Sequence, residues 1–447
     1  MKHLSPSFIT IAVCISIVSL TACNNKTDSG NSNSSDTTNQ QATGAASNLQ
    51  PDKDNGGIKL PQGFGAIVVT DNLGKARHLA VNSNGDVFVK LADVKNGKGI
   101  IRLRDTNNDG KADSITGFGN YGGTGIAIKN GFLYASSNTD VYRYPLNGNG
   151  EVTNTAQPQT IVTGLVDKGQ HNSKSIALDN AGNIYVNIGA PSNSCQVEDR
   201  TPGSKGQDPC PILDYAGGIW QFKADGQKQS YKEGVHYATG IRNVVGLDWN
   251  TNVNELFAMQ HGRDQLHDLF PALYTDSMSA ELPAEEMLEV TKGSNFGWPY
   301  CYYDEFQKKL MLAPEYGGDG KKEGRCTDAK GPVMAFPGHW APNGLLFYTG
   351  NMFPERYKNG AFIAFHGSWN RAPLQQRGYF VAFVPFENGK PSGNYEVFAE
   401  GFAGGPEIVT PGQAIHRPCG LAQGPDGSLY ISDDTKGTIW KVIYTGK

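Results

Sequence analysis

Hydrophobic and polar positions alternate along this chain in a short phrase that recurs six times. Each phrase is an apolar strand, a tight turn rich in Asp, Asn and Gly, and a second strand rich in Tyr, Phe, Ile and Val. Asn-Gly and Asp-Gly between β-forming residues are the strongest short-range signal of a hairpin, because these residues accept the positive φ of the turn. The six predicted hairpins are 79–89, 126–134, 176–186, 245–258, 344–364 and 421–431.

A hairpin that recurs every few tens of residues predicts an array, in which each unit buries a face that it cannot bury alone. With about four strands per unit and radial closure, such an array is a β-propeller. We therefore predict an all-β, six-bladed β-propeller whose chemistry lies on the loops around its central channel. Helical patterning is scarce, and we expect one short loop helix at 280–289, with its glutamates facing solvent.

The N-terminus predicts export. Lys2 and His3 precede an apolar run at 8–20, which is too short to span a bilayer as a mature helix. The following segment ends in Cys23 and resembles the lipobox of bacterial lipoproteins, in which this cysteine is acylated after cleavage. We therefore predict an exported lipoprotein of the periplasm or outer membrane that touches the membrane only through Cys23. An ordinary secretory signal peptide is the alternative.

Composition divides the chain into three parts. Residues 24–50 contain almost no apolar side chains, so they cannot offset the entropy cost of ordering and are expected to form a tether. We predict a signal peptide at 1–22, a lipid anchor and flexible linker at 23–55, and one propeller domain at 56–447. The formal net charge of −4 gives no basic surface, so nucleic acid is not an expected partner.

Five cysteines follow the predicted lipobox, and in an exported protein two bridges and one free thiol are expected. Cys195 and Cys210 lie within one Gly/Pro-rich insertion, and Cys301 and Cys326 lie within another. A disulfide within each insertion would stabilise a loop that has no hydrophobic core of its own. The spacing of the cysteines alone does not determine the connectivity. Cys419 lies in a strand phrase, where a buried free thiol is expected.

One loop carries an arrangement that is typical of calcium sites. Asp105, Asn107, Asp109 and Asp113 place oxygen-bearing side chains around a sharp glycine turn, as in an EF-hand loop, but Thr116 stands where that loop needs a glutamate. Two interpretations remain: a calcium site, or a solvated hairpin tip built from Asx turns without an ion. Either role is structural, because the loop lies between predicted blade strands.

Side chains suited to catalysis and to anion binding lie next to the predicted hairpins. A neutral imidazole is the usual general base, and Arg and Asn donors suit a carboxylated or quinone-bearing ligand. A single loop His or Arg is more often structural, so the joint pattern carries the argument. The candidates are His171, Arg242 with Asn243, the segments 260–264 and 295–298, His339, and the segments 366–371 and 417–418.

The mature chain resembles the glucose/sorbosone dehydrogenase family, which consists of soluble quinoprotein sugar dehydrogenases with a six-bladed propeller. The likeness is greatest to the sorbosone-type branch, and the matching segments follow the family order from about residue 60 to the end. They are 171–178, 188–189, 240–247, 260–264, 294–299, 341–345, the HGSWNR motif at 366–371, and 417–418.

This resemblance implies pyrroloquinoline quinone (PQQ) as the hydride acceptor and Ca²⁺ as the ion that polarises its carbonyl. It also implies an aldose or sorbosone-like sugar substrate and a quinone or cytochrome as electron acceptor. His171 would be the general base that takes the proton of the sugar hydroxyl. The implied PQQ-binding residues are Arg242, Asn243, Arg417, Thr124 and Trp369, and the implied calcium ligands are the backbone carbonyls of Gly262 and Arg263.

Two positions depart from the family pattern. Ala190 replaces the Asp that orients the catalytic imidazole, so we expect a less well-oriented His171 and a lower activity, unless Asn187 or a loop group substitutes. The cofactor-binding lysine of the glucose-oxidising branch has no counterpart, and Ser368, Trp369 or Arg371 occupies its neighbourhood.

Two other functions remain open. A non-catalytic cell-surface propeller that binds a glycan or a protein does not need Arg242, Asn243 and Arg417 to converge with His171. A calcium-dependent hydrolase, of the kind found among six-bladed lactonases, needs carboxylate and Asn ligands from several blades around one metal. The loops here carry Arg and His at those places instead.

Overall fold

The computed structural model describes residues 49–405 and 407–446. The predicted signal peptide at 1–22, Cys23 and most of the predicted linker lie outside the described residues. Within the described part, Asp52 and Asn55 already hydrogen-bond to the first strand, through the backbone N–H groups of Val68 and Ala66. No helix among the described residues is long and apolar enough to cross a bilayer.

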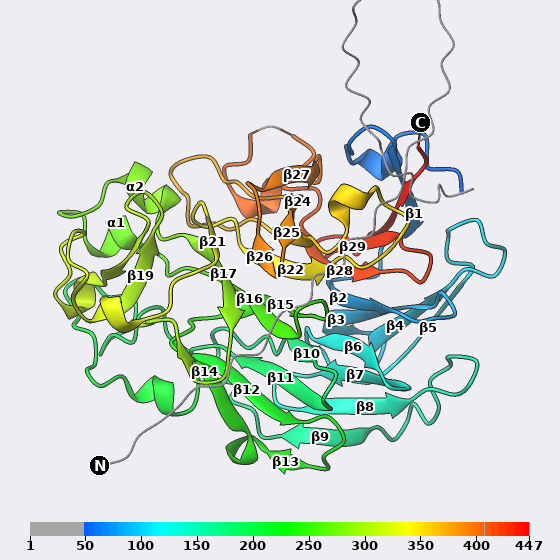
Figure 1. Ribbon diagram of the computed structural model, residues 1–447, viewed down its shortest axis with the longest axis horizontal. Coiled ribbons are helices and arrows are strands. Elements are labelled where there is room, and N and C mark those ends of the chain that lie inside the picture. Colours follow the sequence, from blue (N-terminus) through cyan, green and yellow to red (C-terminus); the bar gives the residue numbers. More distant parts are fainter. Residues whose placement is uncertain (1–48, 406, 447) are drawn as a thin grey trace, which may run out of the picture. The chain divides into compact units, whose positions relative to one another are not determined.

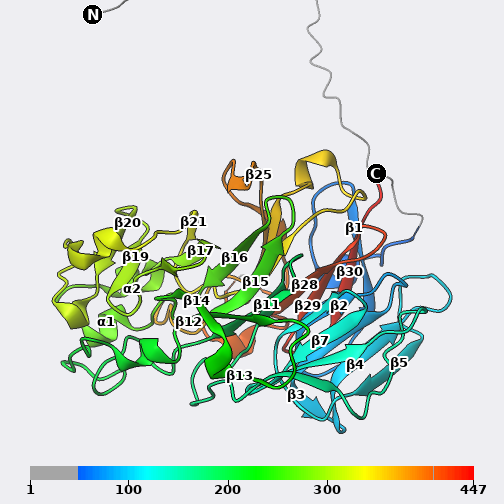
Figure 2. The ribbon, with the colours of Figure 1, turned by 60° about the horizontal axis from the view of Figure 1, so that its bottom comes forward.

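Six four-stranded antiparallel units are arranged around one axis, and Figures 1 and 2 show them in sequence order by colour. Blades one to three, each given from its inner to its outer strand, are β2 (Ala76–Val81), β3 (Val87–Lys95), β4 (Lys98–Arg104) and β5 (Ser114–Phe118); β6 (Ile126–Lys129), β7 (Phe132–Ser136), β8 (Val141–Pro145) and β9 (Gln159–Thr163); and β10 (Ile176–Leu178), β11 (Asn183–Ile188), β12 (Gly218–Lys223) and β14 (Val235–Thr239).

Blades four to six follow the same order. They are β15 (Val244–Asn250), β16 (Glu255–Gln260), β17 (Glu285–Val290) and β21 (Met334–Phe336); β22 (Pro342–Phe347), β23 (Ala361–Phe365), β24 (Phe380–Val384) and β27 (Glu396–Ala399); and β28 (Pro418–Gln423), β29 (Leu429–Asp433), β30 (Ile439–Tyr444) and β1 (Phe64–Thr70). Because β1 supplies the outer strand of the last blade, the two ends of the domain close the ring, with Phe64 opposite Tyr444.

Short elements decorate this ring. Two-residue strands extend two blades, and two small hairpins and two short helices lie in the connections. They are β13 (Gln229–Ser230), β18 (Ser294–Asn295), β19 (Cys301–Asp304) with β20 (Lys309–Leu312), β25 (Phe386–Glu387) with β26 (Lys390–Pro391), α1 (Leu266–Leu269) and α2 (Asp276–Glu281). Single 3-10 turns are η1 (Asn55–Gly57), η2 (Pro211–Asp214), η3 (Tyr231–Glu233), η4 (Pro314–Tyr316), η5 (Gly324–Asp328), η6 (Glu355–Tyr357) and η7 (Pro411–Gln413).

The predicted six-bladed propeller is confirmed, and each of the six sequence phrases forms the two inner strands of a different blade. In the first blade Leu79 lies opposite Val89, and in the last blade Leu421 lies opposite Ile431. Neighbouring inner strands contact one another around the whole ring, including β28 with β2. The buried apolar side chains fill the space between adjacent blades, which explains why each phrase is apolar on both of its strands.

The expectation of one helix at 280–289 is wrong. Helix α2 ends at Glu281, and 285–290 forms β17, an inner-sheet strand with every residue buried. The expectation that its glutamates face solvent is also wrong, because Glu285, Glu286 and Glu289 are 2%, 3% and 9% exposed. A strand buried on both faces shows no alternation, so its acidic positions looked like the polar face of a helix.

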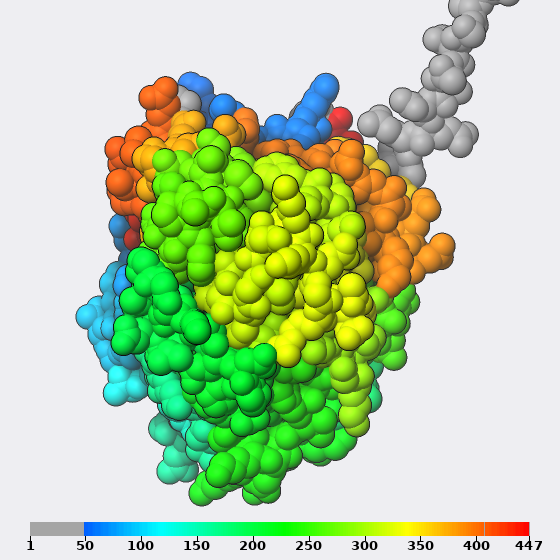
Figure 3. Space-filling model, turned by 90° about the vertical axis from the view of Figure 1, so that its left-hand side faces the viewer, coloured from blue at the N-terminus to red at the C-terminus, as the bar shows by residue number. Residues whose placement is uncertain are grey.

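Both expected local disulfides are present, Cys195–Cys210 and Cys301–Cys326, and Cys419 is a buried free thiol. The two bridges lie in insertions of blades three and four. Figure 3 shows that the connection between β16 and β21, coloured yellow-green to yellow, covers much of one face of the domain. The bridges thus reinforce segments that project from the ring, and disulfides are typical of proteins outside the cytoplasm.

Candidate functional site

A cavity of about 510 Å³, here called the axial cavity, lies where the inner strands of all six blades begin. Every blade contributes a polar side chain, either from the second position of its inner strand or from the loop before that strand. These six are Arg77, Thr124, His171, Asn243, Asn343 and Arg417. Cavities of about 300–1,000 Å³ are typical of sites for small molecules and cofactors.

Five of the six residues predicted for catalysis or cofactor binding meet at this cavity. His171, Asn243, Thr124, Trp369 and Arg417 all line it. They come from five different blades, because each precedes or follows an inner strand and these strands begin at the same end of the ring. Convergence of side chains that are far apart in the sequence is what a ligand site on a propeller requires.

His171 is held with one ring nitrogen fixed. It has a positive φ of 52°, and its Nδ1 donates to the backbone carbonyl of Ala190 at 2.5 Å. This hydrogen bond leaves Nε2 as the unprotonated nitrogen. Burial, and next the positive charge of Arg242, lower the pKa of His171 to about 3, so the ring is neutral.

Of the two substitutes that the sequence left open, Asn187 or a loop group, the structure has a loop group at Ala190. Its side chain lacks a carboxylate, but its main-chain carbonyl accepts the Nδ1 proton. Asn187, the suggested substitute, is used elsewhere: its amide donates to Ser173 O and Asn243 Oδ1, and its Oδ1 accepts from Val244 N. Backbone carbonyls are common orienting partners of imidazole, so a main-chain group here does what a carboxylate does in the family pattern.

One side of the axial cavity is cationic. Arg77 donates to Asp434 at 2.8 Å, and His366 bonds the other carboxylate oxygen of Asp434 at 2.6 Å. Burial alone would raise the pKa of Asp434, but His366 and Arg77 outweigh it and hold this pKa well below its usual range. Arg417 lies beside this group and donates from Nε to His366 O at 3.1 Å.

The first four residues of the HGSWNR motif line the axial cavity, and the last two fix the motif to neighbouring segments. His366, Gly367, Ser368 and Trp369 line the cavity, and Trp369 remains 49% exposed. Asn370 contacts the ring of His339, a buried residue. Arg371 donates to Ala280 O and to Glu281, each at 2.5 Å, which ties the motif to α2.

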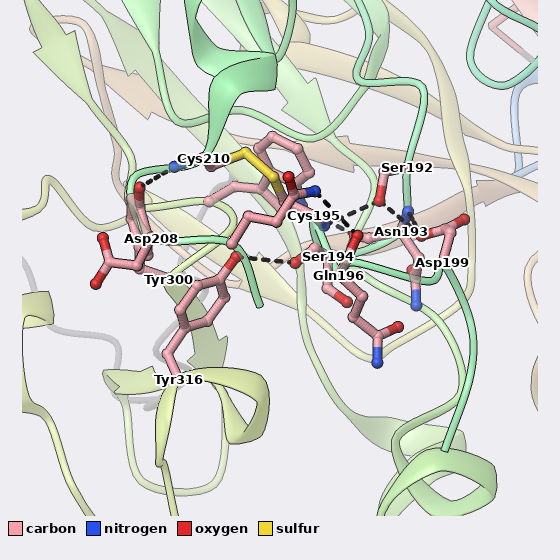
Figure 4. The surroundings of a disulfide bond; sticks show 12 residues. Ser192, Asn193, Ser194, Cys195, Gln196, Asp199, Asp208, Cys210, Tyr300 and Tyr316 are labelled. Atoms are coloured by element: carbon pink, nitrogen blue, oxygen red, sulfur yellow. Dashed lines mark hydrogen bonds between the residues drawn. A yellow bond between two sulfur atoms is a disulfide. The ribbon is translucent and has the colours of Figure 1, made fainter. Parts of the chain in front are cut away.

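Arg242 does not line the axial cavity. Its guanidinium donates to Asp264 at 2.7 Å, to Gly262 O at 2.9 Å and to Asn193 Oδ1 at 3.1 Å. Asn193 also accepts from Asp264 N at 2.8 Å and donates to Asp264 O at 3.0 Å. Figure 4 shows Asn193 two residues from the Cys195–Cys210 bridge, so the disulfide-stapled insertion holds the 262–264 loop.

The predicted calcium carbonyls lie in this loop. Glu285 accepts from the N–H groups of Gly262 and Ala341, both at 3.0 Å, and thereby fixes the direction of the loop. Gly262 O already accepts from Arg242, and Arg263 forms a buried ion pair with Glu315 at 2.5 Å. Among the described residues, no group of three or more His, Cys, Asp or Glu side chains could hold a metal. Gly262 and Arg263 line a small neighbouring cavity and not the axial cavity, and calcium binding at their carbonyls stays a prediction.

The second predicted calcium loop joins β4 to β5 at the surface. Asp105 accepts from the N–H groups of Asn108 and Gly110, both at 2.7 Å. Asp113 accepts from Thr106 N at 2.7 Å, and Asn107 and Asp109 accept from N–H groups two residues further on. These are the contacts of a loop built from Asx turns. Calcium binding at this loop stays a prediction.

Sequence reasoning gave no role to three residues that line the cavity, Arg77, Asn172 and Asn343, or to Asp434, which pairs with Arg77. The Oδ1 atoms of Asn172 and Asn343 are buried without a partner among the described residues, in a cavity that both line. A positional signal existed for Arg77 and Asn343, because each lies at the start of an inner-strand phrase, as Arg417 does. Asp434 follows β29 and had no such signal.

Glu286 carries a prediction about stability. Its Oε1 accepts from Gln260 at 2.8 Å, its Oε2 has no partner among the described residues, and burial raises its pKa to about 8. An acid with a raised pKa lowers the free energy of unfolding as the pH rises from the unfolded value of 4.5 towards the folded value. We expect Glu286→Gln to raise the Tm by several degrees at pH 9 and by less at pH 5.

Differential scanning fluorimetry at both pH values checks this. The exposed Glu387 provides the control, since Glu387→Gln is expected to change the Tm little at either pH. An unchanged or lower Tm of Glu286→Gln at pH 9 would show that the carboxylate is compensated in the folded protein.

Comparison with known proteins agrees with this architecture. A family model described as TrAA12-like matches residues 58–445, which is nearly the whole propeller. A PQQ-dependent sugar dehydrogenase of Hypocrea jecorina is 24% identical over 405 residues, covering 83% of this chain and 86% of that protein. An uncharacterized protein of Borreliella burgdorferi is 31% identical over 210 residues, covering 46% of this chain, and the match spans about half (48%) of that protein.

A solved structure, the calcium structure of the Trichoderma reesei Carbohydrate-Active Enzymes Family AA12 protein, has the same fold. It superposes with a TM-score of 0.70 over 89% of this chain and 99% of that chain, at 20% sequence identity. Because the family model extends over far more than half of the sequence, the chain belongs to the TrAA12-like family, whose fold is a propeller and whose relatives include PQQ-dependent sugar dehydrogenases.

Proposed function

We propose that this protein is a PQQ-dependent sugar dehydrogenase that oxidises an aldose or a sorbosone-like sugar. The observation that carries the proposal is that the neutral His171 ring, with Nε2 unprotonated, shares one cavity with the Arg77 and Arg417 guanidinium groups. The Hypocrea jecorina relative, a PQQ-dependent sugar dehydrogenase, supports the cofactor and the substrate class. The lipobox ending in Cys23 and the two disulfides support an exported lipoprotein.

The axial cavity suits a flat ligand with several carboxylates. Arg77 and Arg417 bring positive charge, and Thr124, Asn243 and Ser368 add neutral hydrogen-bonding groups. Charge-assisted hydrogen bonds from guanidinium to carboxylate are about twice as strong as neutral ones. Asn172 and Asn343 each carry an unpartnered buried amide oxygen that a bound ligand or its ion can satisfy.

PQQ, when bound, supplies the hydride acceptor. His171 accepts the proton of the sugar hydroxyl at Nε2, because its Nδ1 proton is committed to Ala190 O. A low pKa keeps the ring unprotonated before the reaction, and the anionic groups of a bound cofactor raise that pKa and so make the ring a stronger base. Trp369, half exposed at the cavity, offers an apolar face to the sugar or the cofactor.

The backbone carbonyls of Gly262 and Arg263 would hold the calcium ion that polarises the cofactor. Glu285 would act as a positioning residue, since its carboxylate fixes the Gly262 N–H. The related Trichoderma reesei protein was solved as a calcium structure, which supports this choice of ion. The electron acceptor that completes the turnover is a quinone or a cytochrome.

Calorimetric titration of the purified protein with PQQ in the presence of calcium tests the proposal. We expect saturable binding by the wild type and a loss of about 1.5–3 kcal/mol in Arg417→Ala, which is typical of removing a charged hydrogen bond. Arg356→Ala is the matched control, because Arg356 is exposed and pairs with Glu396 away from the cavity. If the wild type binds no PQQ, the non-catalytic propeller that binds a glycan or a protein becomes the better explanation.

A further inference from the structure

A second and larger cavity, of about 870 Å³ and here called the lateral cavity, lies beside blade five. It is lined by the aromatic rings of Trp340, Tyr379, Phe380 and Tyr395, together with Arg377. None of these residues lines the axial cavity, and the proposed oxidation of a sugar uses none of them. The lateral cavity therefore needs an explanation of its own.

The two cavities share a thin wall. Gly367 lines the axial cavity, and a Cβ atom added to it would meet the Tyr379 ring at 2.4 Å, so this ring packs directly against the glycine backbone. Tyr379 lines the lateral cavity from the other side, and its ring centre lies 6.0 Å from the Arg417 guanidinium carbon. At this point the Gly367 backbone and the Tyr379 ring, in direct contact, lie between the two cavities.

The backbone of Tyr379 has a strained conformation. Its φ is 62°, in the left-handed region that a bulky side chain rarely adopts. The backbone is fixed by the hydrogen bond from Tyr379 N to Phe365 O at 2.7 Å. Strained conformations of this kind cluster at functional sites, where the surrounding structure enforces them.

The groups of the lateral cavity that lack partners are hydrogen-bond donors. Trp340 Nε1 and Tyr379 Oη are buried and have no partner among the described residues. Arg377 is exposed and forms no hydrogen bond or ion pair within the described part of the chain. The carboxylate at this cavity, Glu400, is already paired with Lys59 at 3.5 Å. Such a site favours a flat, acceptor-rich ligand that gains negative charge. A carbonyl oxygen only accepts hydrogen bonds, whereas each sugar hydroxyl also has a proton to donate.

We propose that the lateral cavity binds a quinone, which accepts the electrons that leave the axial cavity across the Gly367–Tyr379 wall. This inference rests on the proposed function and names its acceptor. Oxidation of a sugar hydroxyl to a carbonyl releases two electrons and two protons. A quinone takes up two electrons and two protons when it becomes a hydroquinone, so the transfer balances without a further reactant. Arg377 stabilises the negative charge that develops on the quinone oxygens.

The probe is 1,4-naphthoquinone-2-sulfonate, a flat anionic quinone, and binding is measured by equilibrium dialysis against the full chain without PQQ. We expect saturable binding, weakened about tenfold or more in Arg377→Gln, which is typical of losing a charge-assisted hydrogen bond. The control is Arg325→Gln, because Arg325 is similarly exposed but pairs with Asp208 on a distant insertion. It should bind the probe as the wild type does.

Two further measurements locate the site and separate this inference from the proposed function. Saturation with PQQ and calcium should leave probe binding intact; competition would place the quinone in the axial cavity and overturn the inference. In stopped-flow experiments, Arg377→Gln should reduce bound PQQ with sugar at the wild-type rate but be reoxidised by the probe about tenfold more slowly. Failure of the sugar step in the wild type would count against the proposed function alone, because probe binding does not depend on it. If Arg377→Gln leaves the affinity for the probe unchanged, the proposed quinone site is wrong. It is also wrong if the cavity binds glucuronate, a charged sugar, in place of the probe.

Discussion

Replacing His171 with glutamine is expected to lower kcat for sugar oxidation by about a hundred- to ten-thousand-fold, the usual contribution of a general base. Glutamine occupies a similar volume and can still donate to Ala190 O, so the affinity for PQQ should change little. The measurement is steady-state dye reduction with a panel of aldoses, together with PQQ titration of the same preparations. The loss should therefore appear in kcat and not in cofactor binding.

The matched control is His267→Gln. His267 lies on α1, where its Nδ1 bonds Tyr274 O at 2.6 Å, and it does not line the axial cavity. Wild-type dye reduction by His171→Gln would make His171 a structural residue. The pH profile gives a second readout: the acid limb of kcat that protonation of His171 causes in the wild type should be absent from His171→Gln.

The fold could be predicted from the sequence because its repeating signal is local. Each inner hairpin joins two strands through a turn of a few residues, so one phrase such as 421–431 contains both partners of the pairing Leu421–Ile431. The failure at 285–290 has the same origin. Strand β17 pairs with β16 and β21, which lie in other segments, and the hydrogen-bond partners of Glu285 and Glu286 (Gly262, Ala341 and Gln260) lie outside the strand as well.

The site was only partly predictable, for a related reason. The loops that precede the inner strands share a position in every blade, so His171, Asn243 and Arg417 could be identified from their places next to the repeating phrases. Partners that meet only after the ring closes leave no local trace. Arg77 and Asp434 are 357 residues apart in the sequence and form an ion pair across the closure between the last blade and the first.

The Ala190 position shows a third limit. Comparing this sequence with the family pattern shows that the carboxylate side chain is missing. It does not show that the main-chain carbonyl of Ala190 takes the place of that carboxylate. The positive φ of His171 turns its ring towards Ala190 O, and that turn depends on the backbone of two loops. Likewise, Arg242 matches the family motif, yet its guanidinium is committed to Asp264, Asn193 and Gly262.

Neutralising Asp434 is expected to lower the free energy of unfolding by about 3–5 kcal/mol at pH 7, the usual cost of breaking a buried ion pair. In Asp434→Asn the Arg77 guanidinium, whose side chain is 13% exposed, loses its counter-charge. The pKa of Asp434 is lowered in the folded protein, so its contribution is present above the unfolded value of 3.8 and shrinks as the pH falls below it. Urea denaturation at pH 7 and pH 3 measures the difference. Asp93→Asn is the control. The Asp93–Lys75 pair lies in the first blade, as Arg77 does, but it is exposed and is worth at most about 1 kcal/mol.

The same variant tests whether the axial cavity is built for an anion. In the wild type, Asp434 pairs with Arg77, which lines the cavity, so a carboxylated cofactor would have to compete with Asp434 for the positive charge of Arg77. Without Asp434, a bound PQQ carboxylate becomes the counter-charge of Arg77, so PQQ should raise the Tm of Asp434→Asn by more degrees than it raises that of the wild type. An equal or smaller rise would mean that Arg77 serves the closure of the ring and not the ligand, and Arg417 would then be the principal cation of the site.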